Sequence, residues 1–333
     1  MAVNRLKKFL GKIVDHKIKS SLMIWGAPGI GKSSVVAAVA ESKEFDFRDV
    51  RISQLAPTDL RGIPVPKENK AYWFPPEFLP VKGKGILFLD EINMAPPAVQ
   101  GIAQQLILDR KVGSYEVPED WFIWSAGNRK NDFAAVFDMP APLANRFIHL
   151  EVDTSLDEFK SYALLNNIDD RIISFLNFRP KLLHKIDKHN PSWPSPRSWD
   201  IANNLLKVGL DIDPAVGVGA SSEFRSLCKV YRTSLPKIEP ILSGKAKPKF
   251  PKDLSAKYAL TCALSVRATT IDNYRNAFLY LADKASMEWL NQCAFDAGSI
   301  CKEKGTSKEL MRAVLSDKHL FKVAEQLTTL MAV

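Results

Sequence analysis

A glycine-rich stretch constrains the fold of this chain more than any other sequence feature. Gly26 to Ser33 reads GAPGIGKS and fits the pattern GxxxxGK[ST] completely. It follows an apolar run at 21–26, which predicts a buried strand, and opens a stretch at 33–41 with helical character. A purely structural glycine turn has no need for lysine and serine at this offset. The order strand, glycine loop, helix therefore predicts a phosphate-binding loop in an α/β fold.

The residue types of this loop suit a nucleotide. Glycine lets the backbone curl so that successive N–H groups face the phosphates, and the helix that follows presents its positive end to the same anion. Lys32 is expected to reach the β- and γ-phosphates, and the Ser33 hydroxyl is expected to bind Mg²⁺. The residues predicted to bind ATP in this stretch are Gly26, Ala27, Pro28, Gly29, Ile30, Gly31, Lys32, Ser33 and Ser34.

A second apolar run ends in two acids. Residues 86–89 (ILFL) are followed by Asp90 and Glu91. A buried strand would deliver both carboxylates at its carboxyl end, beside the phosphate loop. Asp90 would then hold the Mg²⁺ shell, and Glu91 would orient and deprotonate the attacking water. The alternative is a strand that ends in solvated acids, but the complete phosphate loop upstream favours the catalytic interpretation.

Apolar runs separated by helical stretches continue to about residue 153, after which the strand signal fades. Strands that are apolar on both faces indicate a parallel sheet covered on both sides. The expected strands lie at 21–26, 47–53, 85–92, 121–128 and 147–152, and the last helical stretches at 255–264, 271–297 and 308–331. The expected domains are an α/β core at 1–153, a helical lid at 154–244 and a helical C-terminal extension at 245–333.

Composition limits the partners and the compartment. The formal net charge of +9 allows a nucleic-acid partner, but much of the lysine excess lies at 6–19 and 245–252, and the Pro/Lys stretch at 245–252 fits an exposed linker better. No apolar run reaches the about 18 residues of a membrane span, and the N-terminus does not resemble a signal peptide, so a cytoplasmic location and no membrane partner are expected. The cysteines form no CxxC pair, which favours reduced thiols over a zinc site; they are Cys228, Cys262, Cys293 and Cys301.

Further phrases complete a family pattern. They are 56–62 (APTDLRG), 73–76 (WFPP), 92–95 (INMA) and 143–147 (LANRF). Together with the phosphate loop and the acid pair, they resemble the AAA+ ATPases, and more narrowly the MoxR-like branch. The resemblance covers about residues 20–213. It also implies that the insertion at 57–80 is the helix-2 insert of that branch.

The resemblance implies roles for three polar residues. Asn128 matches the sensor-1 position, where its amide would fix the water or the γ-phosphate; the alternative is an asparagine that ends a strand. Arg146 resembles the arginine finger that enters a neighbouring subunit's site, with Arg129 as its rival in sequence. Arg197 resembles the sensor-2 arginine, which reaches the γ-phosphate in cis. An ordinary surface salt bridge is the alternative for both Arg146 and Arg197.

Two smaller features carry expectations of their own. Residues 108–118 predict a hairpin that turns at Gly113–Ser114 and resembles the pre-sensor-1 hairpin. In relatives this hairpin and the helix-2 insert line a central pore; the alternative is two packed surface excursions. His149 lies in an apolar strand, where a packed or hydrogen-bonded histidine is expected.

The favoured function is a ring-forming ATPase that remodels, matures or activates a protein complex. A finger supplied in trans needs a neighbour, and head-to-tail neighbours close into rings. MoxR-like relatives are typically hexamers and often work with a partner that carries a von Willebrand factor A domain. The alternative is a nucleic-acid-stimulated motor or loader, although no zinc ribbon or winged helix is recognisable. A nucleotide-gated module that barely turns over is opposed by the intact Glu91 and Asn128.

Overall fold

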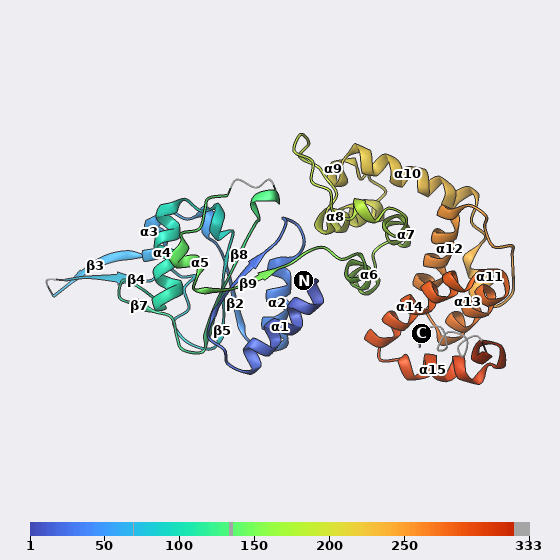
Figure 1. Cartoon of the computed structure of the whole chain (residues 1–333), viewed down its shortest axis with the longest axis horizontal. Coiled ribbons are helices and arrows are strands. Elements are labelled where there is room, and N and C mark those ends of the chain that lie inside the picture. Colours follow the sequence, from blue (N-terminus) through green and yellow to red (C-terminus); the bar gives the residue numbers. More distant parts are fainter. Residues whose placement is uncertain (69, 133–135, 323–333) are drawn as a thin grey trace. The chain divides into compact units, whose positions relative to one another are not determined.

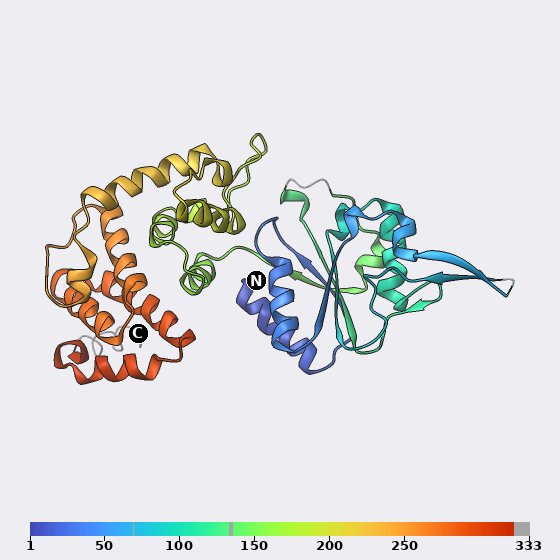
Figure 2. The ribbon, with the colours of Figure 1, turned by 180° about the vertical axis from the view of Figure 1, so that it is seen from behind.

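The computed structural model describes residues 1–68, 70–132 and 136–322. The chain divides into two compact units, Met1–Ser155 and Leu156–Val333. The first contains the strands and the second consists of helices, as the colours of Figures 1 and 2 show. Within the described ranges, no helix is long and apolar enough to cross a membrane.

The first unit is built on a five-stranded sheet in the order β2-β5-β8-β1-β9. All neighbours in this sheet run parallel, which confirms the predicted parallel α/β core. The strands are β1 (Ser21–Trp25), β2 (Asp46–Arg51), β5 (Gly85–Asp90), β8 (Trp121–Gly127) and β9 (Phe147–Glu151). Because all the strands point the same way, their carboxyl ends meet at one edge, where ligands bind in such sheets.

Alternating side chains of each strand enter two separate apolar clusters, one on each face of the sheet. Along β5, Ile86 and Phe88 belong to one cluster, and Leu87 and Leu89 belong to the other. This period of two explains why the central strands have continuous apolar sequences. One face is covered by α1 (Val3–Asp15) and α2 (Lys32–Ser42), and the other by α3 (Pro57–Arg61), α4 (Pro97–Asp109) and α5 (Ala141–Ala144).

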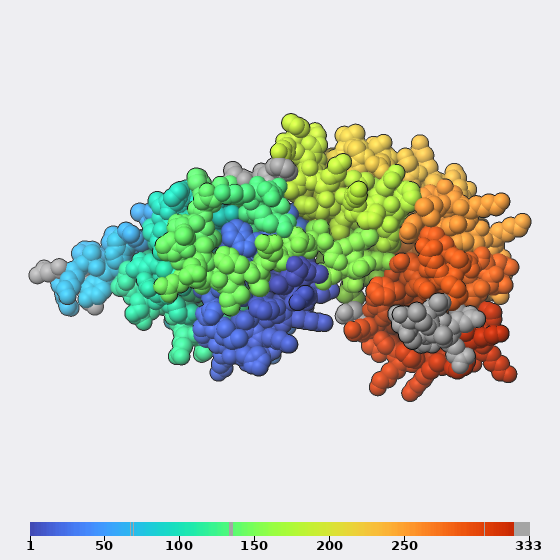
Figure 3. Space-filling model, viewed as in Figure 1, coloured from blue at the N-terminus to red at the C-terminus, as the bar shows by residue number. Residues whose placement is uncertain are grey.

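Two hairpins extend the first unit. The predicted hairpin at 108–118 is confirmed by the antiparallel pair β6 (Lys111–Val112) and β7 (Tyr115–Glu116). The insertion forms a longer antiparallel pair, β3 (Ile63–Lys67) and β4 (Lys70–Phe74), which projects away from the sheet (Figures 1 and 3). Three short 3-10 helices complete the unit: η1 (Ile52–Gln54), η2 (Ile92–Met94) and η3 (Lys130–Asp132).

The second unit is helical over its described residues. Its elements are α6 (Leu156–Leu165), α7 (Asp170–Phe178), η4 (Pro180–Leu182), α8 (Pro196–Lys207), α9 (Asp213–Val216), α10 (Val218–Thr233), α11 (Ile238–Leu242), α12 (Leu254–Arg267), α13 (Ile271–Lys284), α14 (Met287–Glu303) and α15 (Ser307–Ser316). The expectation of one helical stretch at 271–297 is wrong, because the backbone is extended at Ala285 and Ser286 and a new helix begins at Met287. The predicted stretch at 308–331 runs partly outside the described residues.

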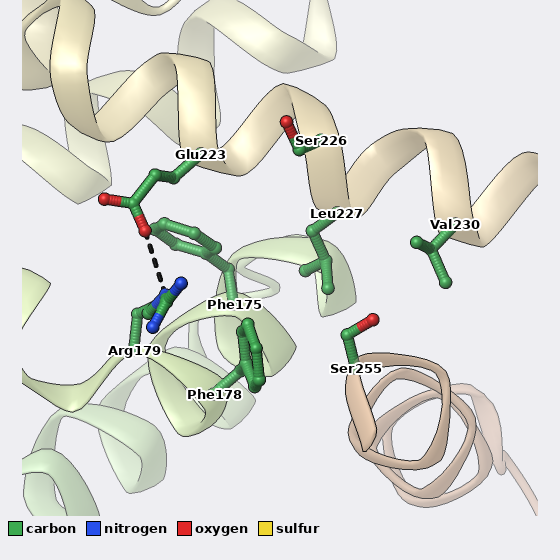
Figure 4. A pocket seen from close by; sticks show the side chains of 8 residues that line it. All are labelled: Phe175, Phe178, Arg179, Glu223, Ser226, Leu227, Val230 and Ser255. Atoms are coloured by element: carbon green, nitrogen blue, oxygen red, sulfur yellow. Dashed lines mark ion pairs between the residues drawn. The ribbon is translucent and has the colours of Figure 1, made fainter. Parts of the chain in front are cut away.

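One helix joins the two apolar clusters of the second unit. On α12, Cys262 packs into the cluster built mainly from α7, α8 and α10, whereas Leu260 and Leu264 pack into that of α13 and α14. A cavity of about 280 Å³ lies among α7, α10 and α12 (Figure 4). Its wall is apolar apart from two serines and the Arg179–Glu223 ion pair at 2.9 Å. All four cysteines are free thiols, and no cluster of metal-binding side chains occurs in the described part of the chain.

Candidate nucleotide site

The loop between β1 and α2 has the backbone that its glycines predict. Gly29 and Gly31 have φ angles of 80° and 91°, which residues with a Cβ rarely adopt. At Gly26 the constraint is close approach instead, because an added Cβ would lie 2.7 Å from the Val152 carbonyl oxygen. The loop therefore needs glycine at these positions for backbone reasons. Ser34, which was predicted to bind ATP, is exposed on the first turn of α2.

Lys32 lies across the loop rather than pointing into solvent. Its Nζ donates hydrogen bonds to the carbonyl oxygens of Gly26 at 2.7 Å and Ala27 at 3.1 Å. It also donates to Oδ1 of Asn128 at 3.0 Å. One ammonium group thus joins the phosphate loop to the carboxyl end of β8.

The two residues predicted to bind Mg²⁺ are in direct contact. The Ser33 hydroxyl donates to Oδ2 of Asp90 at 2.9 Å, and Oδ1 of Asp90 accepts the Glu91 N–H at 2.9 Å. A hydroxyl and a carboxylate are oxygen ligands of the kind that Mg²⁺ prefers. The pair therefore fits a magnesium ion at the mouth of the loop.

Glu91 is held by a residue that the sequence did not point to. Its backbone is left-handed, with φ of 57°, an uncommon conformation for a residue other than glycine. Its carboxylate accepts a hydrogen bond from the hydroxyl of Ser53 on η1. β2 pairs with β5 so that Arg51 lies opposite Asp90, and this register brings Ser53 beside Glu91. Only the strand order reveals the contact.

Asn128 is fixed by a second residue that sequence reasoning missed. The buried Asn93 donates from Nδ2 to the Asn128 carbonyl oxygen at 2.7 Å, and its Oδ1 accepts the Asn128 N–H at 3.2 Å. These two bonds satisfy the backbone of Asn128 and leave its side chain directed at Lys32 and Met94. The nearest sequence signal was the phrase INMA, in which Asn93 is the polar member.

The edge of the sheet near the acid pair carries concentrated negative charge. The pKa of Asp49 on β2 is raised, chiefly by desolvation and then by the Asp90 carboxylate, while Arg51 opposes the shift and Glu91 adds a smaller increase. The negative charge of Asp90 and Glu91 that acts on Asp49 is a field that favours a cation. This electrostatic arrangement supports the same magnesium position as the Ser33–Asp90 contact.

The structure separates the two rival arginines of the first unit. Arg129 is held by ion pairs to Asp132 at 3.1 Å and Asp153 at 2.7 Å, and its hydrogen bonds to these two carboxylates raise its pKa. Arg146 follows α5, is exposed, and makes no ion pair with any residue that the structure describes. Arg197 belongs to the second unit, where it is exposed in the first turn of α8.

The strand order, the glycine loop and the Ser33–Asp90 contact define a P-loop nucleotide-binding domain. Residues 21–129 match the family model of the AAA domain, dynein-related subfamily. The match spans about a third of the chain and includes the loop, the acid pair and Asn128. The chain therefore contains an AAA domain, which is a P-loop ATPase domain.

Comparison with whole proteins gives distant similarities. A stretch of 163 residues is 26% identical to midasin from Giardia intestinalis and covers 46% of this chain but 3% of midasin. A RuvB mutant from Thermotoga maritima is 16% identical, with a TM-score of 0.42, over 85% of this chain and 89% of that chain. NtrX from Brucella abortus is 15% identical, with a TM-score of 0.37, over 90% of this chain and 68% of that chain.

Proposed function

We propose that this chain is a ring-forming AAA+ ATPase that hydrolyses Mg-ATP at Gly26 to Ser34 with Asp90 and Glu91. The observation that carries the proposal is the contact between Ser33 and Asp90 at 2.9 Å, with the Lys32 ammonium beside it. Residues from β1, α2, β5 and β8 meet at one edge of the sheet. A structural glycine turn would not need this convergence.

Each polar group of the site has a chemical task. The loop N–H groups and the Lys32 ammonium bind the phosphates, and Lys32 must turn from its carbonyl partners to do so. Magnesium, held by Ser33 and Asp90, would neutralise charge on the phosphate oxygens. Glu91 orients the attacking water and takes its proton, while the Asn128 amide holds that water or the γ-phosphate in line.

Arg146 is the best candidate for the finger that completes a neighbour's site. Its exposed position supports this role, whereas Arg129 is committed to Asp132 and Asp153 within its own unit. A guanidinium that enters from a neighbour stabilises the transition-state charge and makes catalysis depend on assembly. By resemblance, Arg197 would contact the γ-phosphate in cis from the lid at 154–244.

The finer biological role rests on the resemblance to the MoxR-like branch. We infer a hexamer that remodels, matures or activates another protein complex, together with a partner that carries a von Willebrand factor A domain. Shifts between the core and the helical lid on nucleotide turnover would supply the mechanical work. The projecting β3–β4 hairpin is the element best placed to meet a client protein.

A nucleic-acid-stimulated motor is the second candidate. The observation in its favour is a row of exposed cations on α1, comprising Arg5, Lys7, Lys8 and Lys12. Contacts of this kind with phosphates release counterions, so stimulation by DNA or RNA should fall steeply as salt increases. Stimulation by an acidic protein with no effect of nucleic acid would favour the first candidate.

The test of the ATPase ring is the rate per subunit as a function of protein concentration, measured for the wild type and Arg146→Ala. The specific activity should rise with concentration, and Arg146→Ala should abolish it while ATP still binds. Glu91→Gln is the matched control, because it should also bind ATP and should lose about 10²-fold or more of the rate. A rate that is independent of concentration and survives Arg146→Ala would refute the shared site.

A further inference from the structure

His149 contacts both the strand that leads into the phosphate loop and the short helix that leads to Arg146. Its Nδ1 accepts a hydrogen bond from the indole N–H of Trp25 at 2.8 Å. Its Nε2 lies 2.7 Å from the carbonyl oxygen of Ala144. Because Nδ1 accepts, Nε2 carries the proton and donates it to Ala144. A single neutral imidazole therefore bridges two parts of the first unit.

The parallel register of the sheet produces this bridge. β9 pairs with β1 so that His149 lies opposite Met23, which makes Trp25 its diagonal neighbour on the same face. The His149 and Trp25 rings lie nearly in one plane, with centroids 6.0 Å apart and planes 9° apart, as the in-plane hydrogen bond between them requires. Phe147 meets the imidazole edge-on at 6.1 Å. The ring orientation is thus set by packing as well as by hydrogen bonds.

The other end of the bridge controls the turn that carries Arg146. α5 (Ala141–Ala144) is so short that its last carbonyl groups have no partner within the helix. His149 satisfies the Ala144 carbonyl, and the Arg146 N–H donates to the Leu143 carbonyl oxygen at 3.1 Å. Arg146 therefore lies in a turn whose Ala144 carbonyl oxygen is hydrogen-bonded to His149 on β9.

We infer that His149 is a positioning residue for Arg146. Its hydrogen bond to Ala144 fixes the backbone that carries the exposed Arg146 guanidinium. Its hydrogen bond to Trp25 fixes the position of that backbone relative to Trp25, the residue before Gly26. Arg146, which would enter the neighbouring subunit's site, is thereby held in a fixed position relative to the phosphate loop of its own subunit. This inference rests on the proposed role of Arg146 as a finger in trans.

Three substitutions separate the two hydrogen bonds. His149→Phe keeps an aromatic ring but removes both bonds. His149→Gln can place an amide N–H near the former Nε2 and keep the bond to Ala144. His149→Asn can keep an acceptor for Trp25 but does not reach Ala144. Thermal unfolding of each variant reports whether the fold is retained.

The expected kinetic pattern follows from where Arg146 acts. His149→Phe and His149→Asn should lower kcat about tenfold or more, because a displacement of the order of 1 Å is enough to impair a catalytic group. KM for ATP and the affinity for a fluorescent ATP analogue should stay within about twofold, since an interaction made only in the transition state affects kcat. His149→Gln should recover most of the rate. A loss of nucleotide affinity as large as the loss of kcat would overturn the inference, because His149 would then act through Trp25 on its own site.

Mixed assemblies provide the decisive measurement. Glu91→Gln subunits have an inactive site but a correctly placed Arg146. In a mixed ring they can therefore supply Arg146 to the site of a neighbouring His149→Phe subunit, whose own Arg146 is displaced. The rate per His149→Phe subunit should rise as Glu91→Gln protein is added, and Arg146→Ala should be restored in the same way. Wild type mixed with Glu91→Gln corrects for any inhibition by inactive subunits.

Two failures of this experiment have different meanings. Restoration of Arg146→Ala without restoration of His149→Phe would overturn the role of His149 and leave the finger in place. No restoration of either variant, when wild type keeps its rate in the mixture, would overturn the finger in trans and with it this inference.

Discussion

The ion pair between Lys160 on α6 and Asp296 on α14 is the most sharply testable feature of the second unit. Lys160 Nζ and Asp296 Oδ1 are 2.6 Å apart, and their side chains are only 5% and 1% exposed. Gln292 and Ser265 add hydrogen bonds to the carboxylate. The pair ties the first helix after the AAA core to the last long helix of the described chain.

The cost of breaking the pair follows from its burial. Asp296→Leu leaves an unpaired ammonium in the interior and is expected to lower the free energy of unfolding by about 3–5 kcal/mol. The double variant Lys160→Met with Asp296→Leu replaces both charges with apolar groups and should cost about 1 kcal/mol or less. The two single effects should therefore be strongly non-additive.

The single variant Lys160→Met adds a dependence on pH. Burial raises the pKa of Asp296 even with the Lys160 ammonium beside it. With a folded-state pKa above the unfolded value, the stability contributed by the carboxyl group is present at low pH and is lost as the pH rises through the raised pKa. Removal of Lys160 enlarges this shift, so Lys160→Met should cost least near pH 4 and most at neutral pH.

The measurement is urea denaturation of the full chain followed by circular dichroism, with hydrogen exchange to locate the loss of protection on α6 and α14. The exposed pair Arg179–Glu223, with side chains 52% and 48% exposed, is the matched control and should be worth less than about 1 kcal/mol. Single variants at Lys160 and Asp296 that cost as little as this control, or whose effects simply add, would refute the reasoning.

Three further variants test the nucleotide site. Ser53→Ala removes the hydrogen bond to Glu91 and should change kcat several-fold while ATP affinity stays constant; steady-state kinetics with an unchanged kcat would contradict this. Gly26→Ala places a Cβ 2.7 Å from the Val152 carbonyl oxygen, so titration with an ATP analogue should show weaker binding, and equal affinity would count against the close approach. Asn93→Ala leaves the buried backbone N–H of Asn128 unpaired and should lower the free energy of unfolding by about 1–3 kcal/mol, measured by thermal unfolding. An unchanged melting temperature would contradict this role of Asn93.

Local sequence patterns predicted the parts of the site that lie on one stretch of chain. Gly29, Gly31 and Lys32 belong to a single loop, and the glycines themselves indicate the backbone conformation that this loop needs. Asp90 and Glu91 end a short apolar run that predicted a buried strand, which is β5. The predicted hairpin turn at Gly113 succeeded for the same reason, because a two-residue turn with glycine is a local signal.

Contacts between strands could not be predicted in this way. Ser53 reaches Glu91 only because β2 lies next to β5, and His149 reaches Trp25 only because β9 lies next to β1. β1 and β9 are the first and last strands of the sheet in the chain, and the β3–β4 hairpin separates β2 from β5. The break at Ala285 was missed for another reason: the residues around it keep helical periodicity, and the Ser286 side chain makes no cap hydrogen bond that would mark the start of the next helix.

The hydrogen bonds of Lys32 imply an order of events at the site. Its ammonium contacts the Gly26 and Ala27 carbonyl oxygens and the Asn128 amide oxygen, all of which are poorer partners than phosphate oxygens for a cation. Phosphate binding should therefore draw Lys32 away and release the Asn128 oxygen. Asn93 keeps the Asn128 backbone fixed while this happens, so only the side chain is free to turn. In the role proposed for it, Asn128 can then orient a water only after a nucleotide has engaged Lys32, which would couple catalysis to binding within one subunit.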